Sequence, residues 1–262
     1  MNLIVCIKQV PDTEAKIIIA KNGKSIDDSD INYILNPYDE FAIEEALRLK
    51  EAAQEGEVVL ISVGLERAAT ALRNGLAMGA DGAILITGQT LEKTDPLGVA
   101  SILASVIKHM KYDLIFCGQQ GIGDDNSQVG AMLAELLGIP QVCVVTKIDL
   151  INGKLKVHRE IDGSTEVVEA SLPAVITAQK GLNEPRYPSL RGIMMAKKKP
   201  MEQKSLSDLS LKEEEVGEAG VKIKVVKLEL PPKRKGGGKF EGDPQEGAKK
   251  LVEWLQKEAK IL

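Results

Sequence analysis

Short apolar runs alternate with longer amphipathic segments along the first half of the chain. The runs show little alternation between apolar and polar residues, which is typical of strands buried on both faces of a parallel sheet. The intervening segments place apolar residues three or four positions apart, which predicts helices. The predicted strands are 3–7, 58–63, 83–87, 114–117 and 142–145, and the predicted helices are 38–54, 66–78, 96–110 and 127–137.

The pattern changes after Pro140. Apolar and polar residues now alternate, and the dipeptides Asn152-Gly153 and Asp162-Gly163 are typical of hairpin turns. We therefore predict an α/β fold: an open, mostly parallel nucleotide-binding sheet with helices on both faces, followed by an antiparallel extension. The segments assigned to that extension are 142–149, 155–161, 166–170 and 174–178.

The last quarter of the chain differs from the rest in charge. Residues 197–262 carry a net charge of +4 against −8 for residues 1–196, and their apolar clusters are few. Such a segment cannot easily bury a core of its own. We predict an α/β domain at 1–196 and a charged C-terminal arm at 197–262 that packs on a partner. A helix over 243–260, with Pro244 in its first turn, is expected to end the arm.

Composition excludes several classes of protein. The 262-residue chain has a net charge of −4 and 3% aromatic residues, which argues against nucleic acid as a partner. No apolar run approaches the ~18 residues of a membrane span. The first residues do not resemble a signal peptide, so we expect a cytoplasmic protein with no direct membrane insertion.

The chain contains few residues suited to metal binding or acid–base chemistry. It has two histidines, and Cys6, Cys117 and Cys143 lie far apart in apolar runs. These cysteines are expected to be reduced thiols of the core. We therefore predict neither a metal centre nor catalytic residues.

The segment that follows the run 114–117 is the first candidate binding site. Its glycines allow a ligand to approach the backbone, and a helix beginning near Asn126 would direct free N–H groups at a phosphate. The segment is neither a P-loop nor a complete Rossmann fingerprint, and a plain turn with an asparagine cap explains it equally well. The candidate residues are Gly121, Ile122, Gly123, Asp124, Asp125, Asn126, Ser127, Gln128, Val129, Gly130, Ala131 and Met132.

Two further segments are candidates. The sequence Asn36-Pro37-Tyr38-Asp39 is typical of a helix start, which explains it on local grounds, but that start can also face the same crevice. Segment 181–199 combines prolines, apolar residues and cations, which suits adaptable partner binding as well as an ordinary surface connection with a solvated lysine run. The candidate partner-binding residues are Leu190, Arg191, Ile193, Met194 and Met195.

Taken together, these segments resemble the beta subunit of electron transfer flavoprotein. The resemblance extends over essentially the whole chain, and its motifs follow the family's order. They are Val5-Cys6-Ile7-Lys8-Gln9-Val10-Pro11-Asp12, Asn36-Pro37-Tyr38-Asp39-Glu40-Phe41-Ala42-Ile43-Glu44-Glu45-Ala46, Ala77-Met78-Gly79-Ala80-Asp81, the segment 118–130, Leu182-Asn183-Glu184-Pro185-Arg186-Tyr187, and Met195-Ala196-Lys197-Lys198-Lys199.

The resemblance implies a subunit that pairs with a larger alpha subunit. In the family, the electron-carrying FAD lies mostly in the alpha subunit, near residues of the beta subunit. The beta subunit also holds a nucleotide of its own, which is AMP in forms that serve acyl-CoA dehydrogenases and a second FAD in electron-bifurcating forms. Carried over to this sequence, that nucleotide would touch Cys6, Asn36, Pro37, Tyr38, Asp39, Val63 and residues 121–132.

The resemblance also implies a role for loop 181–199. The loop is similar to the family's recognition loop, in which Leu190 takes the place of the leucine that anchors a partner dehydrogenase. One position departs from the pattern: Thr13 stands where some members have an aromatic residue near the flavin, so we expect no ring contact there.

Two motifs favour AMP over a second FAD. Asp124-Asp125-Asn126 and Asn183-Glu184-Pro185-Arg186 are similar to those of the AMP-holding forms, whereas bifurcating forms tend to have Gly-Asp-Thr where Asp125-Asn126-Ser127 stands. Against this preference, Asn36-Pro37-Tyr38-Asp39 and Gln128-Val129-Gly130 also occur in bifurcating members. We therefore expect AMP and keep a second FAD as the alternative.

The function implied is electron transfer rather than catalysis by the chain's own side chains. FAD would accept electrons from dehydrogenases, of the acyl-CoA type, and pass them to a membrane-bound quinone oxidoreductase. One alternative is an electron-bifurcating form whose second FAD oxidises NADH. An alternative of another class is an adenine-nucleotide-sensing stress-type protein, which shares the architecture; the long loop and the arm argue against it.

Overall fold

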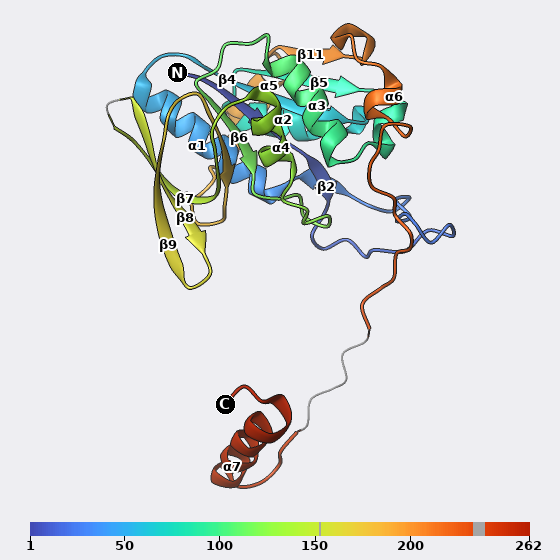
Figure 1. Cartoon of the computed structure of the whole chain (residues 1–262), viewed down its shortest axis with the longest axis vertical. Helices are drawn as coiled ribbons and strands as arrows, with labels where there is room; N and C mark the ends of the chain where they lie inside the picture. The colour runs from blue at the N-terminus through green and yellow to red at the C-terminus, as the bar shows by residue number, and fades with distance from the viewer. Residues whose placement is uncertain (152, 233–238) are drawn as a thin grey trace. The chain divides into compact units, whose positions relative to one another are not determined.

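The computed structural model of the chain describes residues 1–151, 153–232 and 239–262. These described residues divide into two compact units, Met1–Val226 and Lys227–Leu262. Figure 1 shows the first unit as a sheet with helices packed against it. Asn152, the first residue of one predicted hairpin turn, lies outside the described residues.

The sheet of the first unit is mostly parallel. In the part of the chain that the structure describes, nine strands form it in the order β11-β5-β4-β1-β6-β10-β7-β8-β9. Pairing is parallel from β11 to β7 and antiparallel from β7 to β9. A separate antiparallel ribbon pairs β2 with β3. The strands are β1 (Asn2–Cys6), β2 (Gln9–Pro11), β3 (Tyr33–Leu35), β4 (Glu57–Gly64), β5 (Gly82–Thr87), β6 (Leu114–Gly118), β7 (Gln141–Ile151), β8 (Lys154–Ile161), β9 (Ser164–Ala170), β10 (Ala174–Ala178) and β11 (Met201–Lys204).

Helices cover both faces of the sheet. Leu3 and Val5 of β1 pack with α1 and α2 on one face, whereas Ile4 and Cys6 pack with α3 and α4 on the other. The helices are α1 (Pro37–Ala53), α2 (Ala69–Met78), α3 (Pro96–Ile107), α4 (Val129–Leu137), α5 (Leu190–Ala196), α6 (Glu213–Val216) and α7 (Pro244–Trp254), with 3₁₀ turns at Glu66–Ala68, Gln89–Lys93 and Ser207–Leu209 and a π-helical turn at Leu255–Ala259.

The order of the strands places a topological switch beside β1. The chain proceeds from β1 through α1 to β4 and then outward to β5, and it returns to β6 on the opposite side of β1. The two connections leave the sheet on opposite faces, and in open α/β sheets this arrangement leaves a crevice at the carboxyl ends of the strands beside the switch, which here are β1 and β6. Ligands of open α/β sheets bind at such a position.

The predicted fold class is confirmed, with one strand misassigned. Strands β7, β8 and β9 form the antiparallel extension. Segment 174–178, which we assigned to that extension, is instead β10, a parallel strand between β6 and β7. All five of its residues are buried because both faces of the sheet are covered at this position. The apolar character of Ala174–Ala178 is therefore that of a central strand.

The predicted arm begins at residue 197, but residues 197–226 belong to the first unit. Strand β11 extends the sheet beside β5, and Leu206 and Val216 are buried in the core beneath it. Farther along, the carboxylate of Asp95 accepts a hydrogen bond of 2.6 Å from the N–H of Lys222. A segment with few apolar residues can join the domain because it completes an existing core rather than forming one.

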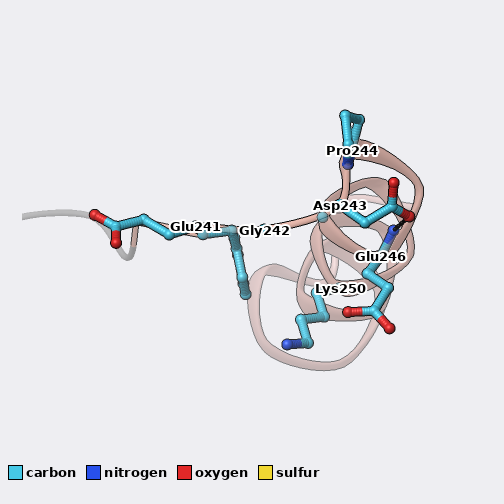
Figure 2. A pocket seen from close by; sticks show the side chains of 8 residues that line it. Glu241, Gly242, Asp243, Pro244, Glu246 and Lys250 are labelled. Carbon is cyan, nitrogen blue, oxygen red and sulfur yellow. Dashed lines mark hydrogen bonds between the residues drawn. The ribbon is translucent and has the colours of Figure 1, made fainter.

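The second unit contains the predicted terminal helix. Pro244 is the first residue of α7, and the side chain of Asp243 accepts a hydrogen bond of 3.3 Å from the N–H of Glu246. Figure 2 shows this cap beside a small hollow into which Lys250 extends. On the described residues of this unit, Leu251 and Trp254 remain about half exposed, at 50% and 48%. None of the described helices is long and apolar enough to span a membrane.

Candidate functional site

The predicted nucleotide-binding residues converge on the crevice beside β1. Cys6, the last residue of β1, pairs in register with Cys117 of β6 on one side and with Ile61 of β4 on the other. Val63 lies near the end of β4, and the glycine-rich segment follows β6 directly. Three separated parts of the sequence therefore meet at one edge of the sheet.

Asn36 links the start of α1 to the glycine-rich segment. It occupies the N-cap position, yet its side chain makes no capping hydrogen bond. Its amide nitrogen instead donates to the carbonyl oxygen of Gln120 at 2.9 Å, and its amide oxygen accepts from the N–H of Ile122 at 3.2 Å. The side chain is buried, at 1% exposed. The predicted helix start is confirmed, with Asn36 at the N-cap and Pro37 as the first helical residue, but the amide of Asn36 holds the neighbouring loop instead of capping the helix.

Asp39 connects three elements beneath this loop. Its carboxylate accepts hydrogen bonds from the N–H of Lys8 at 2.6 Å and from the N–H of Gly118 at 3.0 Å, as well as from Asn36 at 2.9 Å. Asp39 is 3% exposed, and burial raises the pKa of its carboxyl to about 7, against the lowering effect of its hydrogen bonds. This one side chain fixes the ends of β1 and β6 against α1.

Two glycines allow these close approaches. A Cβ on Gly118 would lie 2.2 Å from Oδ1 of Asp39, and a Cβ on Gly121 would lie 3.0 Å from the side chain of Lys8. Lys8 also forms an ion pair with Asp124 across the loop. The glycines therefore allow the loop to lie directly against α1 and the end of β1.

Helix α4 begins later than the sequence suggested. We expected a start near Asn126, but the helix begins at Val129. Asp125 and Ser127 have positive φ angles of 49° and 52°, which interrupt a helical backbone. The side chain of Gln120 reaches this turn and donates to Asp125 at 2.8 Å. Residues 123–128 are thus an exposed, hydrogen-bonded turn.

The start of α4 is pressed against the sheet. A Cβ on Gly130 would lie 2.6 Å from the methyl group of Thr177 on β10. As the first residues of a helix, Val129, Gly130 and Ala131 have no intrahelical acceptors for their N–H groups. These donors and the positive end of the helix dipole suit the phosphate of a nucleotide. The donor set therefore fits an anion at this edge.

A strained valine lies beside the same helix start. Val144 has a φ of 62°, which is unusual for a β-branched residue. Its N–H donates to the side-chain oxygen of Gln119 at 2.8 Å and to the hydroxyl of Thr177 at 3.0 Å. Backbone strain of this kind is found preferentially at functional sites. It marks the β7 side of the crevice, next to Gly130.

Four residues of this arrangement lie within the predicted motifs but are not among the candidate binding residues. Lys8, Gly118, Gln119 and Gln120 position the loop through the contacts described above. Lys8 and Gly118 stand directly after predicted strands, and this position could have indicated that they belong to the site. Gln119 has no such signal, because its partners Val144 and Thr177 become neighbours only when β7 and β10 are in place. Gln120 instead bonds to the turn that follows it.

The predicted docking residues form a separate surface on α5. The side chains of Leu190 and Met194 are 84% and 71% exposed, and Ile193 and Met195 are about half exposed, at 47% and 46%. Arg191 is also exposed. The lysine run 197–199, which the sequence predicts to be solvated, is solvated only in part. Nζ of Lys199 donates hydrogen bonds to the carbonyl oxygens of Leu76 and Ala80 at the end of α2.

Comparisons with known proteins agree on one family. The model of the electron transfer flavoprotein domain matches residues 24–209. Over their full lengths, this chain and electron transfer flavoprotein subunit beta of Bacillus subtilis are 44% identical. The corresponding subunit of Mus musculus is 39% identical, over 92% of this chain and 93% of the relative. The chain belongs to the electron transfer flavoprotein beta-subunit family.

This membership decides between the classes of function considered above. A component of an electron transfer flavoprotein carries electrons and implies an alpha subunit as its partner. The family name also agrees with FAD in the complex. The nucleotide-sensing stress-type alternative is not supported, because the match includes loop 181–199 and, in the Bacillus subtilis relative, the whole chain.

Proposed function

We propose that this chain and an alpha subunit form a heterodimer in which FAD lies mainly in the alpha subunit, at the interface, and AMP is held by this chain. The observation that carries the AMP site is the side chain of Asn36, which holds the loop after β6 instead of capping α1. A buried amide used in this way gives the crevice a fixed shape without a ligand. Such a site suits a structural nucleotide.

The two ends of the crevice suit the two ends of AMP. The N–H groups at the start of α4 and the turn at 121–128 would bind the phosphate. Cys6, Val63 and residues 36–39 would surround the adenosine. A nucleotide that binds only the folded state stabilises it by mass action. FAD supplies the electron chemistry when bound. This chain's own residues bind and orient the nucleotide and exclude water from its site.

We further propose that dehydrogenases of the acyl-CoA type dock on loop 181–199 and that a membrane-bound quinone oxidoreductase accepts the electrons. Support for docking comes from the exposed apolar side chains of Leu190 and Met194. Exposed apolar side chains that cluster on one element are typical of interaction sites. We place the complex in the cytoplasm, as the sequence suggested.

The test is electron transfer by the heterodimer purified with its alpha subunit. We expect an acyl-CoA dehydrogenase reduced with butyryl-CoA to reduce the bound flavin, and NADH alone to leave it oxidised. Reduction by NADH with no reduction by the dehydrogenase would overturn the proposal in favour of the bifurcating form. A heterodimer without a flavin spectrum would overturn both.

A further inference from the structure

Loop 181–199 is fastened to the domain at both of its ends. The first fastening joins residues 183–186 to α1, and the second joins α5 to α2. Between them stand the side chains of Tyr187 and Leu190, which are 96% and 84% exposed. A segment that presents apolar side chains to solvent in this way has little packing of its own to hold it in one conformation.

Arg186 makes the principal contacts of the first fastening. Its guanidinium donates to Glu44 at 2.8 and 3.2 Å and to Glu51 at 2.6 and 3.1 Å, so that one side chain bridges two carboxylates. Glu44 and Glu51 lie two helical turns apart on the same face of α1, which matches the reach of the guanidinium fork. The side chain of Glu44 is 4% exposed, so this ion pair is largely shielded from water.

Two neighbours reinforce that fastening. Arg48 donates to Glu44 at 2.7 Å and to the carbonyl oxygen of Glu184 at 3.1 Å. Asn183 donates to the carbonyl oxygen of Phe41 at 3.0 Å and to the carboxylate of Glu45 at 2.9 Å. Glu44 therefore receives two guanidinium groups, one from α1 and one from the loop.

The second fastening uses backbone contact. A Cβ on Gly192 would lie 2.4 Å from the carbonyl oxygen of Ala77, so α5 lies directly on the end of α2. Arg73 of α2 donates to the carbonyl oxygens of Ala196 and Lys199 at 2.6 and 3.2 Å. The conformation of residues 187–191 is thereby restrained from both sides.

We propose that Arg186 is a positioning residue for electron transfer: its bridge to Glu44 and Glu51 holds loop 181–199 in the conformation that a dehydrogenase binds, so that Leu190 docks without first being ordered. This inference rests on the proposed docking role of the loop. If the loop is in the binding conformation only part of the time, its apparent affinity for the dehydrogenase is reduced in proportion to that fraction of time. Ordering the loop on docking also costs conformational entropy. The arginine thus acts through Leu190.

The test uses the holo-heterodimer as electron acceptor for an acyl-CoA dehydrogenase reduced with butyryl-CoA. Arg186→Gln is expected to raise KM for the heterodimer about tenfold, the value for a loop competent a tenth of the time, with kcat and FAD content unchanged. Arg186→Lys should recover only part of this loss, because one ammonium cannot bridge two carboxylates as the planar fork does. The matched control Lys180→Gln removes the same charge from an exposed residue directly before the loop and should leave KM unchanged.

A double-mutant cycle with Leu190→Ala separates positioning from folding. Leu190→Ala alone should raise KM, and Arg186→Gln should add little to it, because both changes remove the same docking step. Full additivity, or an unchanged KM in Arg186→Gln, would overturn the positioning role. If Leu190→Ala itself leaves KM unchanged, the proposed docking function fails instead, which is a different outcome.

Hydrogen exchange tests the fastening without any dehydrogenase. The amides of Tyr187, Ser189 and Leu190 should exchange faster in Arg186→Gln than in the wild type, while those of the middle of α1 should not change. Equal exchange in both proteins would contradict the inference. If Arg186→Gln does not fold, Glu51→Gln removes only the exposed half of the bridge and should give a smaller change in the same direction.

Discussion

The carboxylate of Asp39 accepts a hydrogen bond of 3.0 Å from the main-chain N–H of Gly118, 79 residues later in the chain. This contact joins the first turn of α1 to the end of β6, and it exists only because Gly118 lacks a Cβ. The same carboxylate also holds the end of β1 through Lys8. The polar groups at the base of the crevice beside β1 are therefore already hydrogen-bonded to one another.

Asp39 is expected to make stability depend on pH. Burial raises the pKa of its carboxyl to about 7 from 3.8. Because the pKa is higher in the folded state, the stabilisation is complete below the unfolded pKa and is lost as pH rises through about 7. Between pH 5 and 8 the loss should be about 2–3 kcal/mol. Urea unfolding at both pH values, with Asp39→Asn as reference, measures it.

In Asp39→Asn this component of the pH dependence should disappear. The variant should also be less stable at pH 8, by about 1–3 kcal/mol, because an amide NH₂ would face an N–H donor of Lys8 or Gly118. The same slope of stability against pH in both proteins would show that Asp39 does not titrate in this range.

Gly130→Ala tests the contact of α4 with the sheet. The new Cβ would lie 2.6 Å from the methyl group of Thr177, so α4 must move away from β10. We expect a loss of about 1–3 kcal/mol in the free energy of unfolding. We also expect less nucleotide in the purified heterodimer. The control is Gly82→Ala, whose Cβ meets Pro200 at an ordinary distance of 3.7 Å. Equal stability of the two variants would argue against the close packing of α4.

Local pattern was sufficient to predict most of the fold. Apolar runs that lack alternation identified β1, β4, β5 and β6, and helical spacing identified the connections between them. The misassigned strand β10 shows where local pattern is not sufficient. A run of five residues of which four are apolar is compatible, after a hairpin, with either an edge or a central position, and only the packing of α1 and α4 on its two faces decides.

The candidate site was predicted less completely. Its glycines and Asn36 were visible, since each occupies a recognisable place after a strand or before a helix. The partners of Asn36 lie 84 and 86 residues away in the sequence, so no local pattern could distinguish a cap from a loop contact. The same reason concealed Arg186, whose carboxylate partners are 142 and 135 residues distant.

Acid is expected to release loop 181–199 from α1. Hydrogen bonds from Arg186 lower the pKa values of Glu44 and Glu51 from 4.5, against the opposing effect of burial. A lowered pKa in the folded state means that this stabilisation is present above 4.5 and is lost as pH falls through the folded values. Hydrogen-exchange protection of Leu190 should therefore fall in acid before that of Ala196, whose carbonyl oxygen accepts from Arg73, a contact without a carboxylate.

Removal of residues 227–262 should abolish the heterodimer without unfolding the α/β domain. The first compact unit ends at Val226, and the second exposes Leu251 and Trp254, which suit packing on the alpha subunit. A chain truncated after Val226 should keep its circular dichroism and its cooperative melting, and it should no longer purify with the alpha subunit. A stable complex of the truncated chain would contradict the predicted role of this segment.

The central claim is that this chain holds AMP in the crevice organised by Asn36. Heat release of the ligands from the purified heterodimer, followed by chromatography, measures it most directly. We predict one FAD and one AMP per heterodimer, and Asn36→Ala should lose AMP while it keeps FAD. The control Asn32→Ala removes an exposed amide with one long hydrogen bond of 3.3 Å to Asp12 and should keep both ligands. Two FAD molecules per heterodimer and no AMP would contradict the account.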